Sequence, residues 1–325
     1  MKKIVIDVNG ADAGLQPVIS GTAEALRQGV ECIPVLVGPA EQITAMMTAE
    51  GISPGQYELV DASDAITNDD PPTCVFAGRE ESSLVKAYAR LKNDESCCAM
   101  VSPGSTGALL VGSICTLGLL PGLKFPALAS ALPCGVENMV CLVDCGANIE
   151  CTANDLVRFA KMGVVLSGCF CGIENPRVGL MSVGREEGKG TALTREAYGK
   201  LRELDLNFVG NLEGSDLVSG YADVVVCDGF SGNVLLKSTE AAGQLAMRII
   251  GEAGKDADPE LIQRLQQAIF RKLEFNSQGA AVFLGTRKTV VKMHGCANAE
   301  TTLSAIRQAL QLEKAGFIDA MTRAL

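Results

Sequence analysis

Short apolar runs rich in Val and Ile alternate with longer amphipathic segments along almost the whole chain, and this alternation constrains the fold most. The short runs predict strands, and the longer segments, with apolar residues recurring at helical spacing, predict helices. The predicted strands are residues 3–7, 33–37, 57–60, 99–102, 127–131, 139–144, 178–183, 207–209, 223–227 and a pair within 282–292. The predicted helices are residues 17–28, 40–49, 82–93, one from 105, one from 152, 192–204, 231–251, 259–273 and one at the C-terminus. This order indicates βαβ units and a mostly parallel sheet.

Two long predicted helices, 231–251 and 259–273, follow one another with no strand between them. They predict a helical hairpin at about 231–273, either packed on the sheet or projecting to a subunit interface. No low-complexity linker or internal repeat divides the chain. We therefore expect one α/β domain over 1–325, or two lobes around a cleft with the chain passing between them more than once.

The composition excludes several classes of protein. Hydrophobic residues make up 47 % and charged residues 20 %, which is typical of a globular chain. The longest apolar stretches, near 108–120 and 162–171, are broken by glycine and are shorter than the ~20 residues of a membrane span. The net charge of −10 disfavours nucleic acid and anionic lipid as partners.

Thirteen cysteines stand at irregular spacings, and the chain has one histidine. An odd count without paired C-x-x-C motifs argues against a disulfide framework and a zinc site. The opening apolar run is too short for a signal peptide, because Asp7 ends it. We expect a reducing cytoplasm, cysteines packed as small core residues, and no metal.

Three glycine-rich turns follow predicted strands. They read Ser102-Pro103-Gly104-Ser105-Thr106-Gly107, Asp144-Cys145-Gly146-Ala147-Asn148 and Asp228-Gly229-Phe230-Ser231-Gly232-Asn233. Ligands of open parallel sheets bind beyond the carboxyl ends of the strands, and N–H groups at a helix start suit an anion such as phosphate. Ordinary turn chemistry accounts for any one of these turns, but three together favour an anion site.

A fourth loop, residues 184–191 (Gly-Arg-Glu-Glu-Gly-Lys-Gly-Thr), resembles a nucleotide-binding P-loop only superficially. It is one residue too short before Gly-Lys, and Gly190 stands where Ser or Thr should reach magnesium. No G-x-G-x-x-G fingerprint follows the first strand, so kinase and dehydrogenase activities are both disfavoured. Lys189 still follows a strand among glycines, where its ammonium can reach a phosphate unless it is simply a solvated loop lysine.

The chain offers no evident covalent nucleophile. A nucleophile elbow is missing, and Cys227 lies in an apolar strand. The remaining mechanism is direct transfer of a group between two bound substrates. In such a mechanism the enzyme positions the reactants and stabilises developing charge. The lone His294 is either catalytic or a hydrogen-bonded structural residue.

Four motifs, in order along the chain, carry a family resemblance. They are Leu-Val-Asp-Cys-Gly-Ala-Asn at 142–148, Glu-Asn-Pro-Arg-Val-Gly-Leu at 174–180, Asn-Phe-Val-Gly-Asn-Leu-Glu-Gly at 207–214, and Ala-Asp-Val-Val-Val-Cys-Asp-Gly-Phe at 222–230. With them the chain resembles the phosphate acyltransferase (PlsX) family of bacterial phospholipid synthesis over nearly its whole length. The resemblance implies a three-layer αβα fold like that of phosphotransacetylases and isopropylmalate dehydrogenase. It also implies a homodimer without a cofactor that moves an acyl group from acyl carrier protein to inorganic phosphate.

The turns and the resemblance together predict the site. We expect Lys189, His294 and Asn233 to be catalytic. We expect the substrate and phosphate to be bound by Ser102, Gly104, Ser105, Thr106, Gly107, Asp144, Asn148, Asn211, Asp228, Ser231 and Gly232. A phosphate oxygen would attack the thioester, with backbone N–H groups, Asn148, Asn233 or His294 as oxyanion donors.

Two basic clusters are candidates for docking the acidic carrier protein, although such clusters are often only solvated faces. They are Arg264, Arg271 and Lys272, and Arg287, Lys288 and Lys292. The family also contacts the membrane through its hairpin tip, beside a membrane glycerol-3-phosphate acyltransferase. Here the tip, 251–259, is polar and acidic, so at most weak peripheral contact is expected.

The chain departs from the family pattern at three places. Residues 7–12 read Asp-Val-Asn-Gly-Ala-Asp in place of Asp-Ala-Met-Gly-Gly-Asp, and residues 102–107 replace Ser-Ala-Gly-Asn-Thr-Gly. The basic run before Ser82 is reduced to Arg79-Glu80-Glu81. Two alternatives therefore stay open: an acyl-CoA-dependent phosphate acetyl- or butyryltransferase, and a non-catalytic protein that binds acyl carrier protein or an acyl chain.

Overall fold

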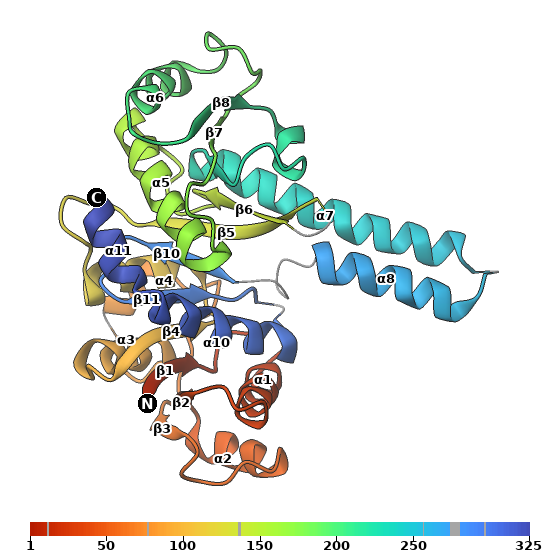
Figure 1. Cartoon of the computed structure of the whole chain (residues 1–325). Coiled ribbons are helices and arrows are strands. Elements are labelled where there is room, and N and C mark those ends of the chain that lie inside the picture. Colours follow the sequence, from red (N-terminus) through yellow and green to blue (C-terminus); the bar gives the residue numbers. More distant parts are fainter. Residues whose placement is uncertain (12, 77, 136–137, 256, 274–279, 296) are drawn as a thin grey trace. The chain divides into compact units, whose positions relative to one another are not determined.

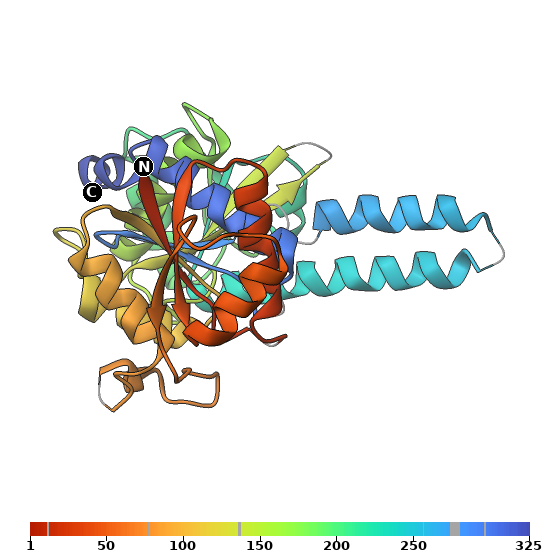
Figure 2. The same ribbon diagram turned by 90° about the horizontal axis from the view of Figure 1, so that it is seen from below.

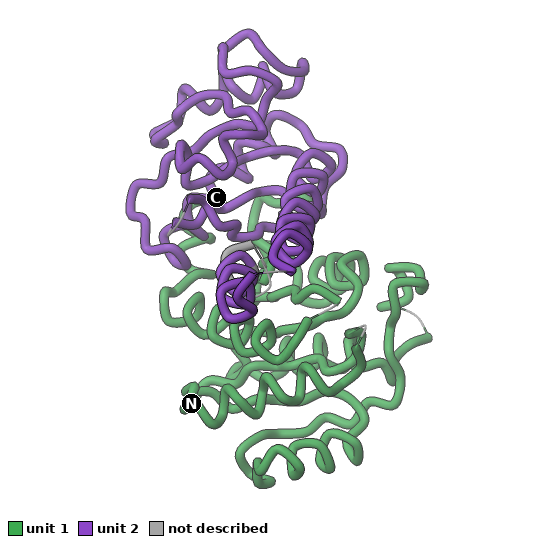
Figure 3. Tube along the Cα trace, turned by 90° about the vertical axis from the view of Figure 1, so that its right-hand side faces the viewer, with its two compact units in different colours: residues 1–126, 279–325 green, residues 127–278 purple. Residues whose placement is uncertain are grey.

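The computed structural model describes residues 1–11, 13–76, 78–135, 138–255, 257–273, 280–295 and 297–325. The chain forms two compact units, coloured separately in Figure 3. Unit 1 comprises Met1–Pro126 and Gly279–Leu325, and unit 2 comprises Ala127–Gln278. Both ends of the chain therefore contribute to unit 1, whereas unit 2 is one continuous segment.

Unit 1 is built on strands in the order β3-β2-β1-β4-β11-β10, all parallel except the β10–β11 pair. The strands are β1 (Lys2–Asp7), β2 (Cys32–Gly38), β3 (Glu58–Asp61), β4 (Cys97–Ser102), β10 (Ala281–Leu284) and β11 (Thr289–Lys292). The helices are α1 (Gln16–Arg27), α2 (Ala40–Ala49), the short η1 (Pro72–Phe76), α3 (Ser83–Asn93), α4 (Thr106–Gly112), the π-turn η2 (Ser113–Leu117), α10 (Ala299–Lys314) and α11 (Phe317–Ala324). Helix α3 packs against β1, β2 and β4. Helix α10 packs against β4 and β11, and α1 packs against α10.

Unit 2 has strands in the order β5-β6-β9-β7-β8, parallel except for the β5–β6 pair. The strands are β5 (Ala127–Cys134), β6 (Asn138–Val143), β7 (Val178–Met181), β8 (Phe208–Leu212) and β9 (Val224–Val226). The helices are α5 (Ala153–Leu166), the π-turn η3 (Ser167–Cys171), α6 (Ala192–Arg202), the short η4 (Gly214–Val218), α7 (Gly229–Ala253) and α8 (Pro259–Leu273). The predicted α/β class with a mostly parallel sheet is confirmed.

Helices α7 and α8 lie antiparallel, side by side, as the predicted hairpin (Figures 1 and 2). Glycine allows the close approach near the tip, since a Cβ on Gly254 would lie 2.1 Å from Ile262 Cδ1. Gln266 Nε2 donates across the pair to the carbonyl of Met247 at 3.2 Å. No helix among the described residues is long and apolar enough to cross a membrane.

Several helix ends differ from the prediction by one or two residues, and two differences have a clear physical cause. The C-terminal helix is in fact two, because Gly316 adopts a left-handed conformation (φ 65°) between α10 and α11. Helix α7 begins at Gly229 rather than Ser231, because Asp228 caps it. Ser231, Gly232 and Asn233 therefore belong to its first turn.

The predicted capping box at the start of α5 forms between Thr152 and Asp155. Replacing Thr152 by alanine leaves the first N–H groups of α5 without this partner, and we expect a loss of ~1 kcal/mol in the free energy of unfolding. Urea denaturation measures it. Thr48→Ala, at an exposed position inside α2, is the control and should change stability by less than ~0.5 kcal/mol. Equal losses in both variants would contradict the role of the cap.

Candidate active site

In unit 1, three neighbouring parallel strands bring polar residues to one edge of the sheet. Strand β4 lies between β1 and β11, and Lys292 is in register with Ser102. Met293 N donates to the carbonyl of Ser102 at 2.9 Å, so His294 leaves β11 beside the turn that follows β4. The predicted residues Ser102 and His294 thus belong to one edge, together with Asp7 at the end of β1.

Asp7 is a site residue that the sequence reasoning missed. Its carboxylate is buried and accepts a hydrogen bond from Ser102 Oγ at 2.7 Å, and Ser102 Oγ in turn accepts from Gly104 N at 3.0 Å. Gly10 adopts φ 87°, and a Cβ there would lie 2.9 Å from the Cα of Gly104. The first βα loop is therefore packed directly on the turn 102–107. The sequence indicated Asp7 in one way only: its carboxylate directly follows the apolar run 4–6 at the end of β1.

The turn 102–107 keeps the properties predicted for an anion site. Ser105 is the N-cap of α4, and its side chain makes no capping hydrogen bond. By contrast, Ser82, Thr152, Thr191 and Asn298 cap the helices that follow them. Ser105, Thr106 and Gly107 are half-buried. The first turn of α4 can therefore offer backbone N–H groups and the positive end of its dipole to an anion.

The three side chains of the basic cluster near β11, Arg287, Lys288 and Lys292, all donate to backbone carbonyls. The Lys292 ammonium donates to the carbonyl of Pro103 at 3.2 Å, within the anion turn, and Lys288 donates to that of Cys97 at 2.9 Å. Arg287 donates to Leu119 O at 3.1 Å. These contacts place Lys292 at the turn, and docking of a partner by the cluster stays a prediction.

In unit 2, the turn 144–148 is filled by its own carboxylate. Asp144 is fully buried and accepts from the backbone N–H groups of Leu128, Gly146, Ala147 and Asn148 at 2.7–3.1 Å. It also accepts from Asn148 Nδ2 at 2.7 Å. Burial raises the pKa of Asp144, against the lowering effect of these donors. The turn was predicted to offer its N–H groups to phosphate, but Asp144 already uses them.

The first turn of α7 is closed in the same way. Asp228 accepts from Ser231 N at 2.8 Å and from Ser231 Oγ at 2.9 Å. Gly232 packs closely, since a Cβ there would lie 1.8 Å from the carbonyl oxygen of Asp144, and its N–H donates to the carbonyl of Asp228 at 2.9 Å. Asn233 is exposed, with its Oδ1 3.7 Å from where a Cβ on Gly146 would be. Of this turn, Asn233 is the side chain best placed to meet a ligand.

Three polar contacts hold the loop 184–191, although its residues 185–189 are exposed. Arg185 pairs with the buried Asp216, and Arg202 pairs with Glu187 at 2.7 Å. Asn211 Nδ2 donates to the carbonyl of Glu186 at 2.9 Å. Lys189 is exposed and makes no ion pair with any described residue. These contacts hold residues 185–187, next to the exposed Lys189.

Asn211 has a second feature. It is 3 % exposed, and its Oδ1 is buried without a hydrogen-bond partner in the described part of the chain. The structure therefore makes Asn211 the anchor of the Lys189 loop and leaves one acceptor unused.

The predicted residues divide between the units. Unit 1 contains the turn 102–107 and His294, and unit 2 contains Lys189, Asn233 and the remaining predicted residues. Except for Asn211, which lies within β8, they stand at or after the carboxyl ends of parallel strands, where ligands of such sheets bind. Among the described residues, no group of three or more His, Cys, Asp or Glu side chains could hold a metal ion.

Comparisons with known proteins identify the family. The model of the fatty acid synthesis protein family matches residues 2–320. A phosphate acyltransferase of Clostridium novyi is 35 % identical over 322 residues, covering 98 % of this chain and 96 % of that protein. One of Thermoanaerobacter pseudethanolicus is 36 % identical, covering 94 % and 92 %. The chain belongs to the fatty acid synthesis protein family, and it is an acyltransferase.

Two solved structures share the fold. A phosphotransacetylase from Streptococcus pyogenes superposes with a TM-score of 0.65 at 19 % identity, covering 96 % of this chain and 94 % of that one. A branched-chain phosphotransacylase from Enterococcus faecalis gives 0.63 at 14 % identity, covering 96 % and 98 %. At such identities the likeness concerns the fold, and it agrees with the predicted αβα architecture.

The buried Asp7 predicts a pH dependence of stability. Burial raises its pKa from 3.8 to about 6, although Ser102 and the Lys292 charge act in the opposite direction. The folded chain therefore binds this proton more tightly than the unfolded chain, and the stability it contributes below pH ~4 is lost as the pH rises through about 6. Asp7→Asn does not titrate, so its free energy of unfolding relative to wild type should rise by up to ~3 kcal/mol between pH 4 and 7. Urea denaturation across this range gives the difference, and a constant difference would contradict it.

The contact at Gly232 predicts a severe effect of one methyl group. Gly232→Ala forces the start of α7 away from the Asp144 carbonyl, and we expect a loss of more than ~3 kcal/mol. The control is Gly199→Ala in α6, where a Cβ meets no atom within 4 Å. That variant should gain up to ~1 kcal/mol, because alanine favours a helix. Thermal and urea unfolding of the two variants separate the outcomes, and a stable Gly232→Ala protein would refute the packing role.

Proposed function

We propose that the chain transfers a fatty acyl group from the thioester of acyl carrier protein to inorganic phosphate, forming acyl phosphate for phospholipid synthesis. The observation that carries the proposal is the turn 102–107. Of the three turns predicted to bind an anion, 144–148 and 228–233 are filled by Asp144 and Asp228, whereas no side-chain cap fills the first turn of α4. Relatives named phosphate acyltransferase support phosphate as that anion.

The reaction needs no base or covalent nucleophile from the protein. A phosphate oxygen attacks the thioester carbonyl carbon, and the C–S bond breaks as the tetrahedral intermediate collapses. The thiolate leaves and takes a proton from solvent. Because phosphate is already an anion, the protein must chiefly position it and stabilise the oxyanion. For these tasks, Lys189, His294 and Asn233 stay the candidates that the sequence predicts.

Partners belong to the same proposal. Arg264, exposed on α8, is the described member of the first basic cluster, since the side chains of Arg271 and Lys272 lie outside the described residues. A homodimer, weak peripheral membrane contact and supply of product to a glycerol-3-phosphate acyltransferase follow from the family resemblance. Exposed Leu245 and Ile249 on α7 and Leu261 and Leu265 on α8 provide apolar area for such contacts.

The proposal is tested by mass detection of acyl phosphate formed from acyl carrier protein thioester and phosphate. Lys189→Ala should lower turnover on the order of 10²-fold, because a charge that stabilises the reacting phosphate is lost. Lys200→Ala, on the neighbouring α6 and paired with Glu196, is the control and should keep normal turnover. Normal turnover of Lys189→Ala would remove this lysine from the mechanism.

The thioester donor is decided in the same assay. If acyl phosphate forms faster from acyl-CoA than from the carrier-protein thioester, the acyl donor is acyl-CoA and not acyl carrier protein. Binding of acyl carrier protein without phosphate-dependent thioester cleavage would make the chain a non-catalytic binding protein.

A further inference from the structure

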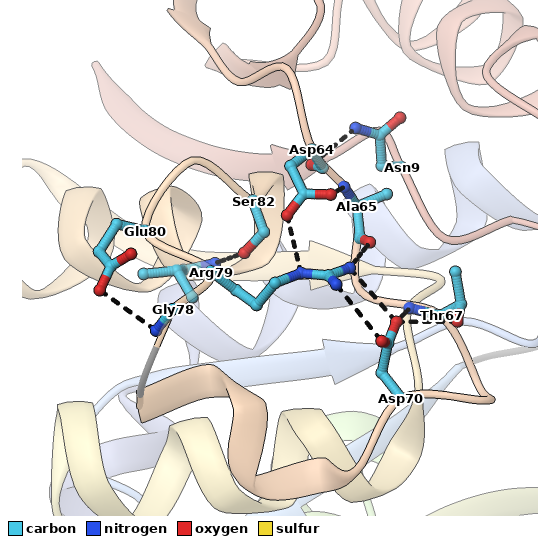
Figure 4. A network of polar contacts seen from close by, with 10 residues as sticks. Asn9, Asp64, Ala65, Thr67, Asp70, Gly78, Arg79, Glu80 and Ser82 are labelled. Carbon is cyan, nitrogen blue, oxygen red and sulfur yellow. Dashed lines mark hydrogen bonds and ion pairs between the residues drawn. The ribbon is translucent and has the colours of Figure 1, made fainter.

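Arg79 is held by two carboxylates and a carbonyl in unit 1 (Figure 4). Its Nε lies 2.7 Å from Asp64 Oδ2, and its terminal nitrogens donate to Asp70 at 3.3–3.4 Å and to the carbonyl of Ala65 at 2.6 Å. A planar guanidinium can serve three acceptors in different directions, which a lysine ammonium on its flexible stem does less well. Residues 64–70 therefore wrap around this one side chain.

The acceptors of Arg79 are themselves fixed. Asp70 accepts from Thr67 N at 2.8 Å and from Thr67 Oγ1 at 2.9 Å, which closes a tight turn. The carbonyl of Asp64 accepts from Ser83 N at 2.9 Å, at the start of α3, and from Asn9 Nδ2 at 3.5 Å. Asn9 belongs to the loop that packs on the turn 102–107 through Gly10. The network thus joins residues 64–70 to the start of α3 and, through Asn9, to the loop that packs on the anion turn.

The same segment reaches the start of α4. Helix η1 begins at Pro72, two residues after Asp70, and Val75 anchors it in the core. A Cβ on Gly107 would lie 2.7 Å from Pro72 Cγ, so Pro72 packs against the first turn of α4. Pro72 lies two residues after Asp70, so the ion pair of Arg79 with Asp70 ties the guanidinium to the segment that contains Pro72.

From these contacts we infer that Arg79 is a positioning residue for phosphate: it keeps residues 64–76 packed on the first turn of α4 and so preserves the geometry of its N–H groups. Arg79 does not bind phosphate itself, since its nitrogens face Asp64, Asp70 and Ala65. The inference rests on the proposed function, because it concerns the turn that we propose to bind phosphate.

The test compares KM for phosphate with KM for the thioester donor. Arg79→Gln should raise the phosphate KM on the order of 10-fold and leave the thioester KM within about twofold, because only the first turn of α4 is displaced. Arg79→Lys should recover part of the loss, since it keeps one ion pair. Asp70→Asn should have a smaller effect than Arg79→Gln, and combining the two should add little, because both break one network.

The chain offers a matched control in Arg90 on α3. Its side chain is 30 % exposed, against 29 % for Arg79, and it also pairs with two carboxylates, Glu58 and Asp94. Arg90→Gln should lose stability as Arg79→Gln does but keep the wild-type KM for phosphate. A rise in phosphate KM in both variants would reduce the role of Arg79 to general stability and overturn the inference.

Failure of the inference and failure of the proposed function are distinguishable. If wild type forms acyl phosphate and Arg79→Gln keeps its phosphate KM, the inference is wrong and the function stands. If wild type forms none, the function is wrong, and hydrogen exchange of residues 105–109 with added inorganic phosphate decides the inference alone. Phosphate should then slow exchange in wild type and less so in Arg79→Gln; equal protection, or none in wild type, would overturn it.

Discussion

A buried carboxylate at the end of a parallel strand organises each unit, and the polar architecture around the candidate site depends on it. In unit 2, Asp144 binds four backbone N–H groups and the Asn148 amide. Its own carbonyl lies so close to α7 that only glycine fits at position 232. In unit 1, Asp7 orients Ser102, whose hydroxyl accepts from Gly104 N. A buried charge is costly unless hydrogen bonds satisfy it, so these turns have little freedom to rearrange.

Carboxylates also distinguish glycine-rich turns that are similar in sequence, because they decide whether the N–H groups of a turn are already bonded. A glycine-rich turn before a helix attracts an anion, but the anion can be a side chain of the turn itself. Asp144 and Asp228 take that place in unit 2, whereas the first turn of α4 lacks such a side chain. The difference directs the phosphate proposal to residues 102–107. It also explains why motifs 142–148 and 222–230 can be essential to the fold without each binding substrate.

Polar and packing contacts also hold the loops that contain the candidate site residues. The loop before Lys189 is held at residues 185–187 by the ion pairs of Arg185 and Glu187 and by the Asn211 amide. Gly10 and Pro72 both pack against the turn 102–107. Arg79 contacts Asp64 and Ala65, in the segment that leads to Pro72. In a reaction that depends on placing an anion beside a thioester, such support matters as much as the contacting groups.

The sequence by itself determined the order and type of nearly all the strands and helices, because apolar periodicity and glycine placement are local properties. It also determined the family, through ordered motifs, and it brought Ser102, Lys189 and His294 to strand ends. Tertiary structure alone decided which N–H groups remain for a ligand, since that depends on whether a carboxylate such as Asp144 folds back onto its own turn. It decided too that Asp7 and Arg79 belong to the surroundings of the site. Their partners are distant in sequence or depend on loop conformation, and no local pattern encodes those contacts.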